Sequence, residues 1–131
     1  MRPTLPFLAV ALATAGCHAA SSEPLSEMTR AREVISDSLP PNHPSKGPLL
    51  LYAMRLDEAL RNPGDRASVR AALVATNCLG LMPDGHLPSD TRNAVNAALV
   101  SSPSRESAYR RYVIDSSAMA LTREDLECRE E

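Results

Sequence analysis

The sequence is poor in aromatic residues, with no Trp, one Phe and three Tyr. Sugars and unpaired nucleic-acid bases are commonly bound by stacking on aromatic side chains, so this scarcity argues against both ligand classes. A surplus of positive charge is also lacking, because 14 Lys and Arg face 16 Asp and Glu, for a formal net charge of −2. The composition therefore provides no electrostatic basis for nucleic-acid binding.

The sequence also lacks an apolar run long enough to cross a bilayer. Its N-terminal apolar segment, LPFLAVALATA at residues 5–15, spans 11 residues, whereas a membrane-spanning helix needs roughly 20. Arg2 precedes this segment, and the small residues Thr14-Ala15-Gly16 follow it. This order is typical of an export signal, so we expect residues 1–16 to be a signal peptide. The alternative is a buried helix of a cytosolic protein.

Cys17 comes directly after the small residues. The stretch Thr14-Ala15-Gly16-Cys17 resembles the lipobox of bacterial lipoproteins, in which the cysteine is lipidated and becomes the new N-terminus. Thr14 departs from the leucine that is usual in the family. The resemblance implies acyl chains on Cys17, which would hold the protein durably at a membrane, and an acylated tether over residues 17–23. His18 after the cysteine implies the outer membrane, facing the periplasm. The alternative is ordinary cleavage after Ala19 or Ala20, which releases a soluble protein.

Cysteine is scarce as well, with three residues in the chain. If Cys17 is lipidated, Cys78 and Cys128 remain, and an even number in an oxidising compartment predicts one disulfide. A reactive thiol or a metal pair is the alternative, but neither cysteine lies in a CxxC or CxH spacing. The three histidines are scattered without metal-ligand spacing. We expect no metal and no cofactor.

The hydrophobic pattern predicts an all-α protein, a small bundle of about five to six short helices. Apolar residues recur at helical spacing, and no alternating run of strand length is present. Ser, Thr and Asp residues stand at positions suited to cap several of these helices. We expect helices within residues 24–39, 49–61, 66–81 and 90–100, a fifth that begins at Pro103, and a short last one capped by Thr122. The expected caps of the other helices are Ser22 or Glu23, Asp65, Ser89 and Ser102.

Residues 40–48, PPNHPSKGP, contain four prolines and one glycine. Such a segment interrupts a helical pattern and favours an irregular or polyproline-like link. We therefore expect an N-terminal helical arm and proline-rich linker over residues 24–47, followed by a compact helical domain over residues 48–131.

Residues 69–99 are similar to the helical peptidoglycan-binding domains of cell-wall enzymes. The similarity lies in Leu79-Gly80-Leu81, Asp84-Gly85, and Thr91-Arg92 with Ala94-Val95. It implies that Asp84 and Arg92 line a groove that meets peptide or glycan. Pro88 stands where the family has a glycine, and Ala98-Leu99 where it has an aromatic residue and glutamine. The alternative is a turn between two helices with a serine cap, which requires the same residue types.

Arg105, Tyr109, Arg110 and Tyr112 form a second group of candidates, because Tyr and Arg are enriched at binding hot spots. The alternative is semi-buried tyrosines beside solvated arginines. Asp84, His86 and Ser89 share one turn without a nucleophile elbow or an oxyanion element, so we do not expect an enzyme.

These features predict an envelope lipoprotein that acts near the membrane as a non-catalytic binding or structural module associated with peptidoglycan. Its partners would be the membrane, through the acyl chains on Cys17, and peptidoglycan or a periplasmic protein. The alternative function is an immunity or inhibitor lipoprotein that blocks a toxin or a cell-wall hydrolase.

Overall fold

The computed structural model describes residues 26–82, 87 and 89–128, and over these residues the secondary structure is helical, without a strand. The predicted all-α fold is therefore confirmed. None of the helices in this part of the chain is long and apolar enough to cross a membrane. The helices are α2 (Glu27–Ser38), α3 (Lys46–Arg61), α4 (Arg66–Gly80), α5 (Ser89–Leu99), α6 (Pro103–Ser117) and α7 (Arg123–Leu126).

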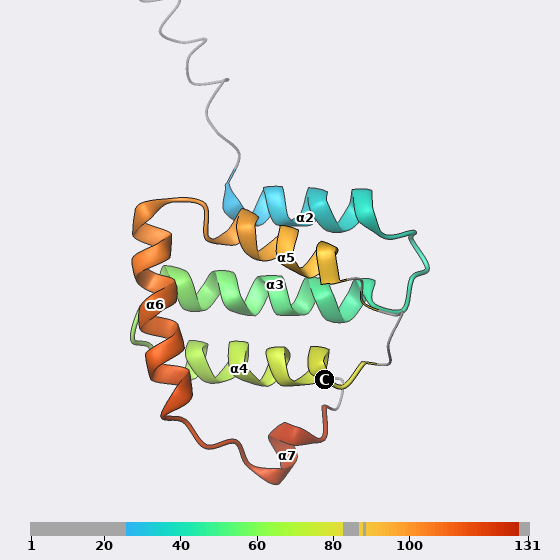
Figure 1. The fold of residues 1–131 in the computed structure, drawn as a ribbon. Coiled ribbons are helices and arrows are strands. Elements are labelled where there is room, and N and C mark those ends of the chain that lie inside the picture. Colours follow the sequence, from blue (N-terminus) through green and yellow to red (C-terminus); the bar gives the residue numbers. More distant parts are fainter. Residues whose placement is uncertain (1–25, 83–86, 88, 129–131) are drawn as a thin grey trace, which may run out of the picture.

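Helix α3 lies at the centre of the molecule and packs against α2, α4, α5 and α6. In Figure 1, α2, α3 and α4 run side by side, α5 lies between α2 and α3, and α6 crosses the ends of α3 and α4. The position of α3 follows from its sequence, because apolar residues at helical spacing occupy more than one side of it. Its buried residues are Leu49, Tyr52, Ala53, Leu56, Asp57, Ala59 and Leu60.

Helix α2 is part of the same core, which differs from the expected separation of an arm (24–47) from a domain (48–131). Ala31 and Ile35 of α2 are buried, as is Leu39 just after it, and α2 packs against both α5 and α3. An apolar stripe of this kind must be covered to remove it from water. The proline-rich segment makes the turn that allows this packing, with backbone bonds from His43 to Pro40 and from Lys46 to His43.

Most predicted helix ends are confirmed by the side-chain caps. Asp65 accepts from the Ser68 amide at 3.0 Å, Ser102 accepts from the Arg105 amide at 3.2 Å, and Thr122 forms a capping box with Asp125. Two starts differ. Helix α2 begins at Glu27 with Ser26 as its cap, while Ser22 and Glu23 lie outside the described residues. Helix α3 begins at Lys46, two residues before Pro48, because proline without an amide hydrogen is tolerated in a first turn.

Helical spacing in the sequence also places Met54, Thr76, Ala94 and Val113 on the apolar sides of α3, α4, α5 and α6, but these four residues are exposed. The centres of the apolar sides of α3 and α4 were predicted correctly, since Leu56 and Val69 are 1 % exposed.

The predicted disulfide between Cys78 and Cys128 is present, with the two Cα atoms 5.5 Å apart. It joins the C-terminal part of α4 to the residues after α7. Helix α7 has no buried residue of its own, and its further links to α4 are the ion pair between Asp125 and Arg70 and a contact of 3.8 Å from the Asn77 amide to the Cys128 sulfur. The disulfide is therefore the main restraint that holds α7 in place.

A charged network joins α2, α3 and α6 in the interior. The Arg105 guanidinium of α6 lies 2.8 Å from the Asp57 carboxylate and 3.4 Å from that of Glu27. The exposed fractions of the Arg105 and Asp57 side chains are 13 % and 7 %. Arg61 adds a second bond to Asp57 at 3.0 Å, from a much more exposed position. The Asp57–Arg105 pair therefore bridges two helices where water has little access.

Candidate functional site

The three tyrosines of the chain, Tyr52 from α3 and Tyr109 and Tyr112 from α6, interact with one another, and we call them the tyrosine cluster. The rings of Tyr109 and Tyr112 are tilted, with centroids 6.0 Å apart. Tyr52 and Tyr112 are buried, and Tyr109 is partly buried. Residues three positions apart share one side of a helix, which explains the pairing within α6. Tyr52 reaches the pair because α6 packs on α3.

The hydroxyl groups of the cluster have partners on two further helices. The Tyr52 hydroxyl donates to Oδ1 of Asn96 in α5, and the Tyr112 hydroxyl interacts with the Thr76 side chain of α4. Burial raises the pKa of Tyr52 to about 12, with the neighbouring Tyr109 and Tyr112 adding to the effect. Burial also raises the pKa of Tyr112. Both phenols are therefore neutral near pH 7 and serve as packing groups that connect helices.

The Tyr52 hydroxyl makes stability depend on alkaline pH. The unfolded chain loses this proton near pH 10 and the folded chain near pH 12, so the unfolded state holds fewer protons between these values. The free energy of unfolding should therefore fall from pH 10 to pH 12, by up to roughly 2–3 kcal/mol. Urea unfolding of the protein and of Tyr52→Phe across this range measures the effect. If the free energy of unfolding fell equally in the two proteins between pH 10 and pH 12, Tyr52 would not be responsible.

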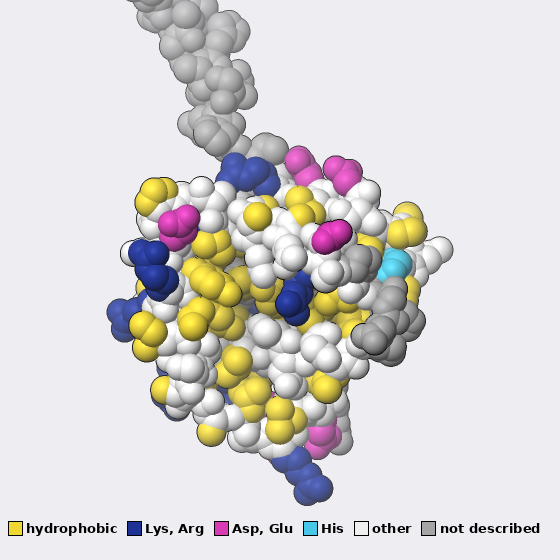
Figure 2. Space-filling model, in the orientation of Figure 1, with side chains coloured by type: hydrophobic (Ala, Val, Ile, Leu, Met, Phe, Trp, Pro, Cys, Tyr) yellow, Lys and Arg dark blue, Asp and Glu magenta, His cyan; other side chains and the backbone are white. Residues whose placement is uncertain are grey.

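Arg92 in α5 lies beside the tyrosine cluster. Its side chain is exposed, and its charge lowers the pKa of Tyr52 against the larger effect of burial. The structure thus brings together residues that the sequence placed in two separate candidate sites. Figure 2 shows hydrophobic side chains gathered beside α6 on this face, with a Lys or Arg side chain next to them. Asp84, predicted as the partner of Arg92, lies outside the described residues.

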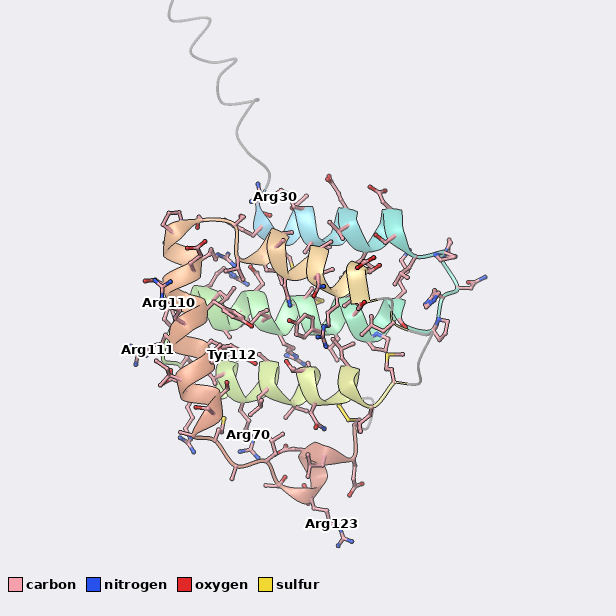
Figure 3. All side chains as sticks on the ribbon, in the orientation of Figure 1. Arg30, Arg70, Arg110, Arg111, Tyr112 and Arg123 are labelled. Atoms are coloured by element: carbon pink, nitrogen blue, oxygen red, sulfur yellow. A yellow bond between two sulfur atoms is a disulfide. The ribbon has the colours of Figure 1, made fainter. Side chains whose placement is uncertain are left out.

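The predicted surface of Arg105, Tyr109, Arg110 and Tyr112 does not form one exposed face. Arg105 and Tyr112 lie on the buried side of α6 with Ala108, because positions three, four and seven apart share one side of a helix. The guanidinium of Arg105 is engaged by Asp57 and Glu27. Figure 3 shows Arg110 on the outer side of α6, away from α3 and α4. The four residues therefore divide into two packing residues, Arg105 and Tyr112, the partly buried Tyr109 and one exposed arginine.

A shallow depression lies between the turn that joins α3 to α4 and one side of α6. Its volume is about 250 Å³, and we call it the α6 depression. Sequence reasoning missed it; the available signal was Ile114, an aliphatic residue of α6 outside the stripe expected to be buried. The α6 depression is lined by Gly64, Arg66, Val69, Arg111, Ile114, Asp115, Ala118 and Met119.

A second depression of about 210 Å³ lies between α3 and α4 and is lined by Arg55, Glu58, Ala67, Ser68 and Ala71. In the described part of the chain, no three His, Cys, Asp or Glu side chains gather to hold a metal ion. Comparisons with protein-family models, with curated proteins and with solved structures find no match to this chain. Its chemistry must therefore be argued from its own side chains, which offer arginine donors beside apolar and tyrosine surfaces.

Proposed function

We propose that this protein is a lipid-anchored binding module of the bacterial cell envelope, non-catalytic and associated with peptidoglycan near the outer membrane. Its main support is the order of features along the chain. An export-type segment and a lipobox-like stretch ending at Cys17 precede a helical unit closed by the Cys78–Cys128 disulfide. Disulfides persist in oxidising compartments such as the periplasm, so the bond agrees with export.

The length of chain between Cys17 and the first described helix supports work close to the membrane. Eight residues lie between Cys17 and Ser26, the cap of α2, and the nine steps along the chain from one to the other span at most roughly 30 Å. An anchor on Cys17 would therefore keep the start of α2 within that distance of the bilayer surface. The connection between α5 and α6 lies at the same end of the molecule, and α7 lies at the opposite end (Figure 1).

The face that carries Arg92 is the proposed contact with peptidoglycan. The exposed Arg92 guanidinium is a donor suited to the carboxylates of cell-wall peptides. Tyr109 is partly exposed and, like Arg92, lies close enough to Tyr52 to affect its pKa, and rings of this kind bind through their apolar surface and their hydroxyl group. The rigid attachment of both residues to packed helices would reduce the entropy lost on binding.

Lipidation is tested by the variant Cys17→Ser. We expect this change to remove the protein from the membrane fraction and to abolish its labelling with a fatty-acid precursor, because the acyl chains would have no attachment atom. Cell fractionation with detection by immunoblot measures the distribution, and Cys78→Ser is the matched control that keeps Cys17. Membrane association that survives Cys17→Ser unchanged would overturn the anchor.

Peptidoglycan binding is tested by co-sedimentation of the detergent-solubilised protein with purified sacculi. The protein should pellet with the sacculi, and Arg92→Gln should weaken binding by about threefold or more, the loss expected for one charged hydrogen bond. Arg32→Gln, an exposed arginine of α2, is the control and should bind like the original protein. A protein that stays in the supernatant would exclude this ligand.

A further inference from the structure

The α6 depression combines two guanidinium groups with an apolar wall. Arg66, at the start of α4, is exposed and has no ionic partner among the described residues. Arg111 comes from α6, and its Nε atom lies 3.3 Å from the Asp115 carboxylate. That pair lies at the surface, with 61 % of the Arg111 side chain exposed. Exposed pairs of this kind contribute little stability, so Arg111 keeps donor capacity for a ligand.

The Arg111 guanidinium lies next to Gly64 in the turn between α3 and α4. A Cβ atom at position 64 would lie 2.8 Å from Nη2 of Arg111, closer than two such atoms can approach. Gly64 also adopts a φ of +85°, which other residues rarely adopt. The absence of a side chain at position 64 therefore leaves room for the Arg111 guanidinium beside the turn, at the rim of the depression.

The apolar wall is formed by Val69 of α4, Ile114 of α6 and Met119 after α6. Ile114 is 68 % exposed, the largest exposed fraction among the large hydrophobic residues of the described chain. Covering it would remove apolar surface from water, which is favourable. Small-molecule pockets generally measure roughly 300–1,000 Å³, so a depression of about 250 Å³ suits one or two side chains of a larger partner.

We propose that the α6 depression docks a segment of a partner protein that presents a carboxylate next to an aliphatic side chain. Arg66 and Arg111 would bind the carboxylate, and Ile114 with Met119 would cover the aliphatic group. This surface lies on a different side of α6 from Tyr109. The proposal goes beyond peptidoglycan binding and does not depend on it.

A second copy of the chain is a less suitable occupant. In a two-fold symmetric pair, Arg111 of each copy would meet Asp115 of the other only if the two α6 helices ran antiparallel. Helix α6 runs from the end where α2 begins towards α7 (Figure 1), so antiparallel copies would place their α2 starts at opposite ends. Two chains anchored in one membrane through Cys17 would then need one tether to be held extended along the domain, which costs conformational entropy. This step rests on the proposed anchor.

The chain contains two isoleucines, Ile35 and Ile114, so their methyl groups can serve as NMR probes of ligand binding. Ile114 lines the depression, whereas Ile35 is 2 % exposed in the core. The lipidated full-length protein in detergent micelles, labelled at the isoleucine methyl groups, can be titrated with a capped Glu-Leu dipeptide and followed by NMR. We expect a saturable shift of the Ile114 methyl signal, while the Ile35 signal stays in place.

The variants then test the chemistry. A capped Gln-Leu dipeptide, Arg66→Gln and Arg111→Gln should each weaken binding by about threefold or more, since each removes a charged hydrogen bond. Arg110→Gln is the matched control, because Arg110 is exposed on α6 but does not line the depression, and it should bind like the original protein.

Several outcomes would overturn the proposal. The first two are the absence of a saturable Ile114 shift and equal affinity for the Glu and Gln probes. Soluble cell-wall disaccharide peptides that bind the depression more tightly than the dipeptide would indicate peptidoglycan as the ligand. A dimer in sedimentation experiments that Ile114→Asp dissociates would indicate a second copy. Failure of the sacculus experiment with a normal dipeptide titration would remove the peptidoglycan ligand alone.

Discussion

Replacing Asp57 with Ala is expected to destabilise the protein by about 3–5 kcal/mol, the usual cost of removing one partner from a buried ion pair. The Asp57 and Arg105 side chains are 7 % and 13 % exposed, with 2.8 Å between their charged atoms. Without Asp57, the Arg105 guanidinium would keep Glu27 at 3.4 Å as its ionic partner and a long hydrogen bond of 3.5 Å to the Leu99 carbonyl. Small domains are stable by roughly 5–15 kcal/mol, so the loss is a large part of the total. Urea unfolding followed by far-ultraviolet circular dichroism measures it.

Arg61→Ala is the matched control for this prediction, because Arg61 also binds Asp57 but is 57 % exposed. Its removal should cost less than about 1 kcal/mol, as for other surface ion pairs. A double replacement with apolar residues, Asp57→Leu with Arg105→Met, should recover part of the loss, since the buried Arg105 charge is then removed together with its main partner, and Glu27, which also loses Arg105, is 26 % exposed. Equal costs for Asp57→Ala and Arg61→Ala would show that burial of the Asp57–Arg105 pair is unimportant.

Removal of the disulfide, by Cys78→Ser with Cys128→Ser, should lower the free energy of unfolding by about 4 kcal/mol in the chain-entropy treatment of a closed loop. The two cysteines are 50 residues apart, so the bond restricts a large part of the unfolded chain. Because α7 has no buried residue, it should be the first element to open. Urea unfolding measures the overall loss, and amide hydrogen exchange should show protection lost in α7 before α4.

Arg70→Ala is the control for the role of α7, because it removes the ion pair with Asp125 and leaves the disulfide intact. We expect a smaller loss of stability than in the cysteine variant, with α7 exchange increased but α7 still attached. Identical unfolding midpoints for the oxidised and reduced proteins would contradict the stabilising role of the Cys78–Cys128 bond.

The features predicted correctly from the sequence are those set by short-range interactions. The caps at Asp65, Ser102 and Thr122 depend on bonds to residues three positions away, and proline or glycine near a helix end acts on the same scale. The disulfide was predicted by a different route, since it followed from the number of cysteines left after Cys17. Its geometry was not accessible, because Cys78 and Cys128 lie far apart in the sequence.

The features that sequence reasoning missed depend on distant residues. Arg105 looked like an exposed arginine because its partner, Asp57, lies 48 positions earlier. The Tyr109–Tyr112 pair is visible from helical spacing, but Tyr52 joins it only through the packing of α6 on α3. The α6 depression likewise requires the turn at Gly64 and the side of α6 at Ile114 to meet.

The residues alone therefore establish a helical chain, most of its helix ends and the pairing of Cys78 with Cys128, and they predict an exported lipoprotein. Only the tertiary structure shows that α2 belongs to the core, that the Arg105 side chain is largely buried, and that Arg92 lies beside Tyr52. The physical reason is the range of the interactions. Helical hydrogen bonds and caps act over three or four residues, whereas the choice of which helix faces meet depends on the packing of the whole chain at once.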